Sequence, residues 1–185
     1  MLFRSRGTYY RQEAERKSLR RKLGDAGSYL EALQMEMTVG LVSGQTRARM
    51  AQLINKTNQF NLTGVRTSER DLADMEEDPL RLGLWARLCD TFGDSGLIAA
   101  LVCRRGSTAW DIETFVMSCR ILGRGVEQTL VSVLANQARA AGARTLRGRF
   151  VPTARNRPAT DAFARLGFTR TGGPESDQRW ELDLA

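Results

Sequence analysis

The chain has no histidine among its 185 residues, and its three cysteines form no CxxC pair. Without histidine, neither a Ser-His-Asp nor a Cys-His catalytic centre can be built from this chain alone, and histidine-ligated metal sites are excluded. The cysteine spacing argues against a disulfide framework or a cysteine zinc cluster, so we expect no bound metal. No run of 18 apolar residues occurs, and the first residues contain no apolar signal segment. We therefore expect a cytoplasmic protein without a membrane span.

Positive charge is concentrated at the start of the chain. The net charge is +7, and residues 1–25 hold eight basic and three acidic residues. Such a segment can bind nucleic acid, an anionic membrane or an acidic protein, or it can be a solvated helix or linker. Its aromatic residues are too few for a base-stacking platform, so we do not expect nucleic-acid binding. We interpret residues 1–27 as a basic helical arm or linker and residues 28–185 as the main domain.

The apolar pattern predicts an α+β fold with a mixed sheet, in which helices come first, an antiparallel meander follows, and a β-α-β-α-β series ends the chain. The continuous apolar run over 96–104 suits a strand buried on both faces. Residues 93–96 have the composition of the hairpin turn before it. The predicted helices are 28–37, 46–59, 67–77, 126–141 and 158–166. The predicted strands are 80–92, 96–104, 110–119, 145–151, 168–169 and 179–184.

The most informative segment reads RILGRG and lies between a predicted strand and a predicted amphipathic helix. Its two glycines allow the backbone to turn tightly and approach a ligand. The unpaired amides at the helix start and the positive end of the helix dipole form an anion site suited to phosphate. An ordinary strand-to-helix turn is the alternative. The predicted cofactor-binding residues of this loop are Arg120, Leu122, Gly123, Arg124, Gly125 and Val126.

In this context the RxxGxG pattern resembles the pyrophosphate loop of the GNAT acyltransferases. The chain also resembles the second signature of that superfamily, Asn…Tyr…Gly-Phe, at Asn156, Phe163 and Gly167-Phe168. The resemblance implies a GNAT-like fold and a contact between Asn156 and the pantetheine arm of the donor. In the superfamily the tyrosine often protonates the leaving thiolate, but Phe163 has no proton to give. This departure argues against ordinary transfer from acetyl-CoA to an amine and leaves transfer to a carrier thiol or hydroxyl open.

Several segments of the chain, in one order, resemble the C-terminal half of FkbH-like proteins. They are residues 56–61, 90–97 and 111–127, continued by 152–156 and 166–168. This family takes a glyceryl group from 1,3-bisphosphoglycerate, removes the phosphate and loads an acyl carrier protein for polyketide and related assembly lines. Its N-terminal HAD domain handles the phosphate with a DxDxT nucleophile, and no DxDxT occurs in this chain. The resemblance therefore implies the acyltransferase half alone, with an acyl carrier protein as partner and a separate HAD-type phosphatase as a further partner.

Cys119 is the candidate nucleophile, because relay through a cysteine thioester divides one acyl transfer into two easier steps. A thiol beside Arg120 and near a helix N-terminus is expected to hold more thiolate. A buried core cysteine is the alternative. Since histidine is absent, the base must be a carboxylate or a water chain. The resemblance points to Asp94, which can also simply cap a turn, and Asp111 and Glu113 are alternatives.

Side-chain amides and hydroxyls suit a polyhydroxylated acyl group such as glyceryl, although helix capping and turn formation also explain asparagine. The candidate substrate-binding residues are Asn58, Gln59, Asn61 and Thr114. We predict an acyltransferase that moves a glyceryl or related hydroxyacyl group, through a Cys119 thioester, onto the phosphopantetheine thiol of an acyl carrier protein. The alternatives are a CoA-dependent N-acetyltransferase and a non-catalytic carrier-binding module. Carrier proteins are usually acidic, so the positive net charge favours their docking.

Overall fold

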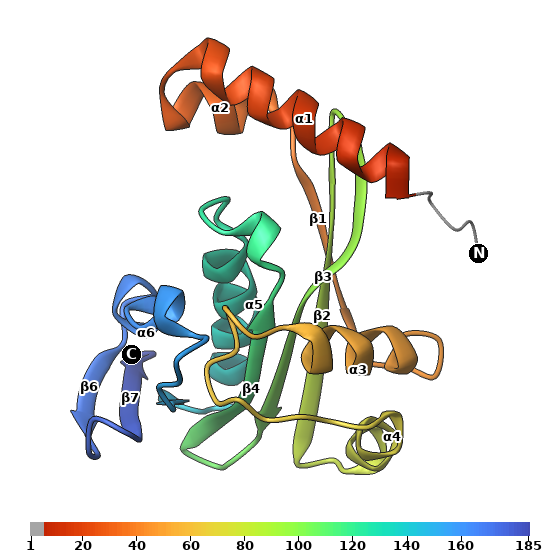
Figure 1. Cartoon of the computed structure of the whole chain (residues 1–185). Coiled ribbons are helices and arrows are strands. Elements are labelled where there is room, and N and C mark those ends of the chain that lie inside the picture. Colours follow the sequence, from red (N-terminus) through yellow and green to blue (C-terminus); the bar gives the residue numbers. More distant parts are fainter. Residues whose placement is uncertain (1–5) are drawn as a thin grey trace. The chain divides into compact units, whose positions relative to one another are not determined.

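The structure is a computed structural model that describes residues 6–185 (Figure 1). Residues 1–5 of the predicted basic arm lie outside the described residues. The chain forms two compact units: unit 1 comprises Met1–Thr38 and Arg87–Gly96, and unit 2 comprises Val39–Ala86 and Leu97–Ala185. The predicted domain boundary at residue 27 stays a prediction. No helix within 6–185 is long and apolar enough to cross a membrane.

Unit 1 contains the helices α1 (Arg6–Leu23) and α2 (Ala26–Ala32) and the tip of the β2–β3 hairpin. The guanidinium of Arg16 is buried and donates two hydrogen bonds of 2.7 Å to the carboxylate of Asp90. Asp90 Oδ1 also accepts hydrogen bonds from the amides of Phe92 and Gly93. The hairpin turn therefore lies at Asp90–Gly93, three residues before the predicted position, because the Asp90 side chain organises it.

The predicted helix over 28–37 is wrong in its second half. Asp25 caps α2 by accepting a hydrogen bond of 2.9 Å from the amide of Ser28, and the helix ends at Ala32. Gln34 has a φ of 45°, a left-handed conformation that stops the helix. The strand β1 (Glu36–Leu41) follows. Met37 fits a helical stripe and an alternating strand equally well, so periodicity alone did not separate the two.

Seven strands form one mixed sheet in the order β1-β2-β3-β4-β5-β7-β6, which confirms the predicted mixed α/β fold. The pairs β3–β4, β5–β7 and β6–β7 are antiparallel, whereas β4 and β5 are parallel. The apolar run over 97–103 is buried throughout, as predicted for a central strand. The further strand bounds are β2 (Arg81–Asp90), β3 (Gly93–Arg104), β4 (Ala109–Met117), β5 (Thr145–Phe150), β6 (Thr169–Gly172) and β7 (Gln178–Asp183).

Four helices complete unit 2. The helices α3 (Arg47–Lys56) and α4 (Glu69–Glu77) contact each other, and α3 contacts β4. Ser68 and Asp71 form a capping box at the start of α4, which confirms the helix start predicted near Thr-Ser. The helix α5 (Val126–Ala140) contacts β4 and β5. Instead of one helix over 158–166, a short 3-10 turn precedes α6 (Ala162–Arg165).

Candidate functional site

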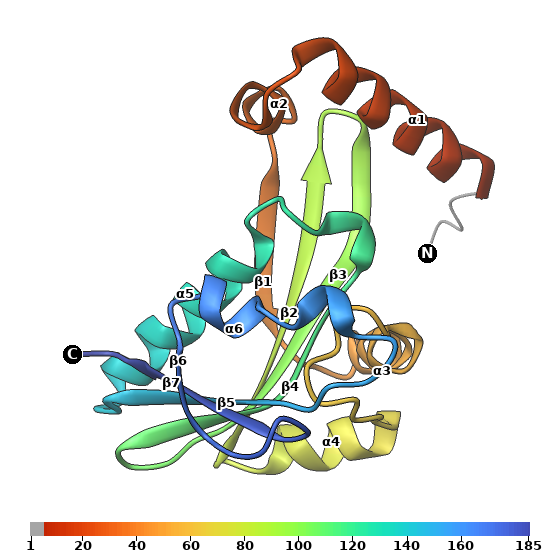
Figure 2. The same cartoon turned by 60° about the vertical axis from the view of Figure 1, so that its left-hand side comes forward.

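The strands β4 and β5 lie together at one end and separate toward the other (Figure 2). They pair in parallel only from Ala109 with Thr145 to Ile112 with Gly148. At the point of separation β4 has a β-bulge, because Val102 of β3 pairs with Thr114 and the next residue, Cys103, pairs with Ile112. A bulge bends its strand and redirects side chains, which accounts for the divergence.

Residues 60–62, here called the bridging segment, close the gap between the separated strands. The amide of Leu62 donates to Phe115 O at 3.2 Å, and the amide of Met117 donates to Phe60 O at 3.0 Å. On the other side, the amide of Val151, just after β5, donates to Leu62 O at 2.8 Å. Phe60 and Leu62 are fully buried. The sequence did not predict this segment, because three residues are too few to display an alternating pattern.

Asn156 holds the bridging segment in place. The residue is 1% exposed. Its Oδ1 accepts a hydrogen bond of 2.7 Å from the amide of Thr153, and its Nδ2 donates to Asn61 O and Val151 O, both at 2.9 Å. Asn156 thus ties the loop after β5 to the bridging segment. Its predicted contact with a pantetheine arm stays a prediction.

Phe163, at the position of the superfamily's tyrosine, is a core residue. It is 2% exposed, and its ring centroid lies 4.9 Å from that of Phe168 and 6.1 Å from that of Trp180. Gly148 of β5 makes room for it, since a Cβ at that position would lie 2.3 Å from Phe163 Cε1. The phenylalanine therefore supports the packing of α6 on β5.

The predicted strand over 110–119 ends two residues early, at Met117, and a 3-10 turn over Cys119–Ile121 follows. Gly123 and Gly125 have φ values of 75° and 77°, in the left-handed region. No atom lies within 4 Å of a Cβ built on either glycine. Glycine is therefore required by the backbone turn, and the surrounding space is open. The predicted tight turn before α5 is confirmed.

This turn directly precedes α5, a helix of 15 residues. The first amides of α5 have no acceptor within the helix, and the helix dipole places partial positive charge at them. Arg120 and Arg124 add positive charge on the same loop, and Arg120 Nε donates a hydrogen bond of 3.0 Å to Ser118 Oγ. The segment from Arg120 to Val126, here called the anion loop, has the backbone and charge that a phosphate group requires.

Glu127, in the first turn of α5, is only 4% exposed, and among the described residues its Oε2 has no hydrogen-bond partner. A buried polar atom without a partner is unusual and costs free energy. A ligand that donates a hydrogen bond at this place would remove that cost. No sequence pattern singles out this carboxylate, because its burial depends on how α5 packs.

The three cysteines differ in accessibility. Cys119 is exposed at the edge of the anion loop, so the alternative of a buried core residue is wrong. Cys103 is fully buried, and burial raises the pKa of its thiol to about 12. Cys89 is half-buried, and burial also raises the pKa of its thiol. Cys119 is therefore the cysteine available to a reactant.

Asp94, the predicted base, belongs to unit 1, whereas Cys119 belongs to unit 2. Its carboxylate accepts hydrogen bonds from Arg87 Nε and Nη2 at 3.1 and 2.8 Å and from the amide of Gly96 at 2.7 Å. The hydrogen bonds from Arg87 lower the pKa of Asp94 to about 2. Such a carboxylate is a weak base near neutral pH. The Gly96 contact matches the turn-capping alternative, and the role as a base stays a prediction.

The candidate substrate residues separate into two groups. Asn61 Oδ1 accepts a hydrogen bond of 2.8 Å from the amide of Gly64, and Asn58 Oδ1 accepts one of 2.6 Å from Arg66 Nη2. The Asn61 contact matches the turn-forming alternative, the Asn58 contact joins two side chains eight residues apart, and Gln59 is exposed. Thr114 lies elsewhere, in the lining of a cavity in unit 2.

This cavity has a volume of about 930 Å³. Its walls come from residues 63–67, α4, β2, β3, β4, β5, β6 and β7. The sequence did not predict it, because it is assembled from eight separate parts of the chain. Its charged lining residues are Arg66, Asp71, Arg81, Asp111, Glu113, Arg147, Arg149, Arg179 and Glu181.

Within residues 6–185, no three Cys, Asp or Glu side chains are grouped so as to hold a metal ion. No family model matches the sequence, and no curated protein matches it.

Solved structures do match the fold. The GNAT domain of S. lividans PAT superimposes with a TM-score of 0.61 and 20% identity, over 78% of this chain and 89% of that chain. The ribosomal-protein-S18-alanine N-acetyltransferase from Escherichia coli superimposes with a TM-score of 0.61 and 14% identity, over 81% of this chain and 95% of that chain. An aminoglycoside 6'-N-acetyltransferase complexed with coenzyme A superimposes with a TM-score of 0.59 and 12% identity, over 80% of this chain and 97% of that chain. The likeness to FkbH-like proteins stays a prediction from the sequence. The chain has the fold of the GNAT acetyltransferases.

Proposed function

We propose that this chain is an acyltransferase whose donor is a thioester on a phosphopantetheine arm, with a phosphate of that arm bound at the anion loop. The observation that carries this proposal is the pair of left-handed glycines, Gly123 and Gly125, with open space around them at the start of α5. Backbone amides at a helix N-terminus bind phosphate oxygens well. The fold shared with acetyltransferases, one of them complexed with coenzyme A, supports acyl transfer.

The residues present fit such an arm. A phosphopantetheine arm contains two amide N–H groups and a hydroxyl, all of which can donate to the buried Oε2 of Glu127. Arg120 and Arg124 supply charge for the phosphate. The arm supplies an activated acyl thioester, whereas the chain's own residues bind and orient it.

The test uses two glycines with equal backbone strain. Gly142 follows α5 with a φ of 86° and, like Gly125, has no atom within 4 Å of a built Cβ. Alanine at either position costs about 1–2 kcal/mol, because both backbones are left-handed. The two glycines lie at opposite ends of a helix about 22 Å long.

Calorimetric titration with CoA and with 4'-phosphopantetheine should give equal affinities for the wild type and Gly142→Ala. Gly125→Ala should bind at least about tenfold more weakly, a loss of about 1.4 kcal/mol of binding free energy. Equal affinities for the two alanine variants would contradict a phosphate site at the anion loop.

For the acyl group, we propose glyceryl or a related hydroxyacyl group, relayed by Cys119 to the thiol of an acyl carrier protein. The resemblance to FkbH-like proteins and the exposure of Cys119 beside the anion loop support this. The Cys119 thiolate attacks the donor thioester, a new C–S bond forms, and the donor leaves as a thiolate. The carrier thiolate then attacks the Cys119 thioester and releases Cys119, so no oxidant, reductant or net proton is needed.

Intact-mass measurement with a glyceryl-loaded donor tests the relay. The wild type and the control Cys89→Ala should both gain the mass of one glyceryl group, and Cys119→Ala should gain none. Transfer to the carrier by Cys119→Ala at the wild-type rate would contradict the relay.

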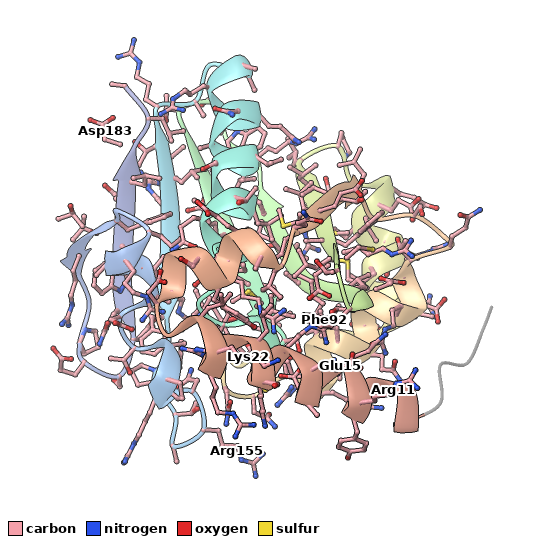
Figure 3. All side chains as sticks on the ribbon, turned by 90° about the horizontal axis from the view of Figure 1, so that it is seen from above. Arg11, Glu15, Lys22, Phe92, Arg155 and Asp183 are labelled. Atoms are coloured by element: carbon pink, nitrogen blue, oxygen red, sulfur yellow. The ribbon has the colours of Figure 1, made fainter. Side chains whose placement is uncertain are left out.

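For the carrier, we propose docking on α1. Exposed basic side chains lie along this helix, with Arg11 and Lys22 labelled in Figure 3. An acidic carrier would be attracted to them, and its association should weaken as salt rises. A separate HAD-type phosphatase is the second proposed partner, on the ground of the resemblance alone.

Transfer of an acetyl group from CoA to a small amine is the second candidate function. It is favoured by Asp111, which lines the cavity and whose carboxylate, within the described part of the chain, forms no hydrogen bond or ion pair. A carboxylate in this state can bind an ammonium group and accept its proton. Acetylation of amines by acetyl-CoA, without any transfer to a carrier, would favour this candidate over the first.

A further inference from the structure

The cavity in unit 2 is charged unevenly, and the β-bulge in β4 is one cause. Side chains of a regular strand alternate between the two faces of a sheet, so Asp111 and Glu113 share a face. Because Glu113 is the extra residue of the bulge, Thr114 also reaches the cavity. One wall of the cavity thus presents two carboxylates and a hydroxyl from four consecutive positions of β4.

The two carboxylates on this wall differ in their partners. Glu113 Oε2 accepts hydrogen bonds of 3.1 and 2.6 Å from Arg81, and its Oε1 accepts one of 3.1 Å from Arg104. Asp111 is half-buried, and over residues 6–185 its carboxylate makes no hydrogen bond or ion pair. Asp111 is therefore the carboxylate of the β4 wall that no side chain of the described residues occupies.

On the β7 side of the cavity, the exposed Arg179 forms no ion pair among the described residues, and its charge, after the hydrogen bonds from Arg149, also lowers the pKa of Asp177. Arg149 and Arg179 are direct neighbours across β5 and β7, an arrangement in which like charges repel. Arg149 is neutralised by Asp177 through hydrogen bonds of 2.6 and 2.9 Å. Arg179 lines the cavity, and the described residues offer its guanidinium no ion pair.

The arginine of β5 that lies between Asp111 and β7 is paired with a carboxylate of β7. Asp111 is aligned with Arg147 of β5, and Arg147 is aligned with Glu181 of β7. Arg147 Nε and Glu181 Oε1 form an ion pair of 3.1 Å.

On these three strands, the charged cavity residues without an ion pair among residues 6–185 are therefore Asp111 on β4 and Arg179 on β7. Arg66, which donates to carbonyls and to Asn58, and Asp71, which caps α4, also line the cavity. Two strand spacings separate β4 from β7, which places their backbones about 10 Å apart.

We propose that this cavity binds a small dipolar molecule, with an ammonium group at Asp111 and a carboxylate or other anionic group at Arg179. The class is that of amino acids and short peptides whose opposite charges lie up to about 10 Å apart. The volume of about 930 Å³ lies within the range of small-molecule sites. The proposal rests on the second candidate function, transfer of an acetyl group from CoA to a small amine, in which the cavity takes the acceptor, and it names the acceptor's class.

Calorimetric titration of the full chain with 6-aminohexanoate, hexylamine and hexanoate tests the dipolar requirement. These probes share one carbon chain length and differ in which charges they carry. The wild type should bind 6-aminohexanoate at least about tenfold more tightly than either singly charged probe. Equal binding of all three probes, or none, would overturn the proposal.

Variants locate the two charges. Asp111→Asn should reduce binding of 6-aminohexanoate and hexylamine but not of hexanoate, and Arg179→Gln should reduce binding of 6-aminohexanoate and hexanoate but not of hexylamine. Arg144→Gln, an exposed substitution outside the cavity lining, is the matched control and should bind like the wild type. Wild-type binding by both Asp111→Asn and Arg179→Gln would overturn the assignment.

The same set of proteins separates this inference from the proposed function. Gly125→Ala should lose affinity for CoA and keep that for 6-aminohexanoate. If CoA binds and acyl transfer proceeds while Asp111→Asn and Arg179→Gln match the wild type, the cavity inference fails and the function stands. If 6-aminohexanoate binds as described but no thioester donor binds, the proposed function fails and the dipolar cavity stands.

Discussion

Replacing Asn156 by alanine should destabilise the protein even when no ligand is present. The change removes one hydrogen bond to the amide of Thr153 and two to the carbonyls of Asn61 and Val151. It leaves these backbone groups without a partner beside a residue that is 1% exposed. The bridging segment then loses its side-chain link to the loop after β5.

The magnitude follows from the number of bonds. Three hydrogen bonds at about 1 kcal/mol each give a loss of about 3 kcal/mol in the free energy of unfolding. For a chain of this size that corresponds to a fall in melting temperature of about 6–12 °C. The protein should still fold, because domains of this kind are stable by about 5–15 kcal/mol.

Urea and thermal unfolding without any CoA or thioester provide the assay. Arg155→Ala is the control, since this neighbouring side chain is exposed and should change stability by less than about 0.5 kcal/mol. Hydrogen exchange should accelerate at the amides of Leu62 and Val151 in Asn156→Ala. If this variant unfolded like the wild type but bound CoA more weakly, Asn156 would be a ligand contact, and its role in holding the bridging segment would be refuted.

Three further predictions concern single residues. When the folded protein is treated with iodoacetamide, peptide mass mapping should show rapid modification of Cys119 and modification of Cys103 only after unfolding. The reason is that Cys103 is buried and the pKa of its thiol is raised to about 12. Rapid modification of Cys103 would contradict its core position. Gly148→Ala should lower the free energy of unfolding measured in urea by about 1–3 kcal/mol, because the new methyl group overlaps the Phe163 ring. An unchanged unfolding midpoint would show that α6 shifts to make room for the methyl group without loss of stability. The pKa of Asp94 is lowered to about 2, so its charged form stabilises the fold above its ordinary pKa, and this contribution is lost as the pH falls through about 2. Asp94→Asn should therefore flatten the pH dependence of unfolding between about pH 4 and 2, and a pH profile identical to that of the wild type would contradict the lowered pKa.

Local patterns were sufficient to predict the anion loop. The glycines at 123 and 125, the arginines and the apolar stripe of α5 lie within one continuous segment, so the turn and the helix could be read together. The apolar stripe predicted for this helix is Val126, Leu130, Val133, Leu134 and Ala138. All of these are buried except Val133, which is half-buried.

Features that depend on distant contacts were missed. The first two residues of β1 were predicted as the end of a helix, because the pairing of β1 with β2 decides its conformation and the sequence of one strand does not contain that partner. The bridging segment is held by β4 and by Val151, far from it in the chain. The unequal pairing of Asp111 and Glu113 likewise depends on Arg81 and Arg104. Both carboxylates were candidates from the sequence, and only the structure separates them.

The central claim is that the anion loop binds the phosphate of the donor arm. Titration of ¹⁵N-labelled protein with CoA tests it most directly, because each backbone amide reports separately. The largest shifts should fall on the amides from Gly123 to Glu127, and they should be lost in Gly125→Ala but kept in Gly142→Ala. Saturating CoA that leaves these amides unchanged, or that shifts only residues around Arg179 in the cavity, would contradict it.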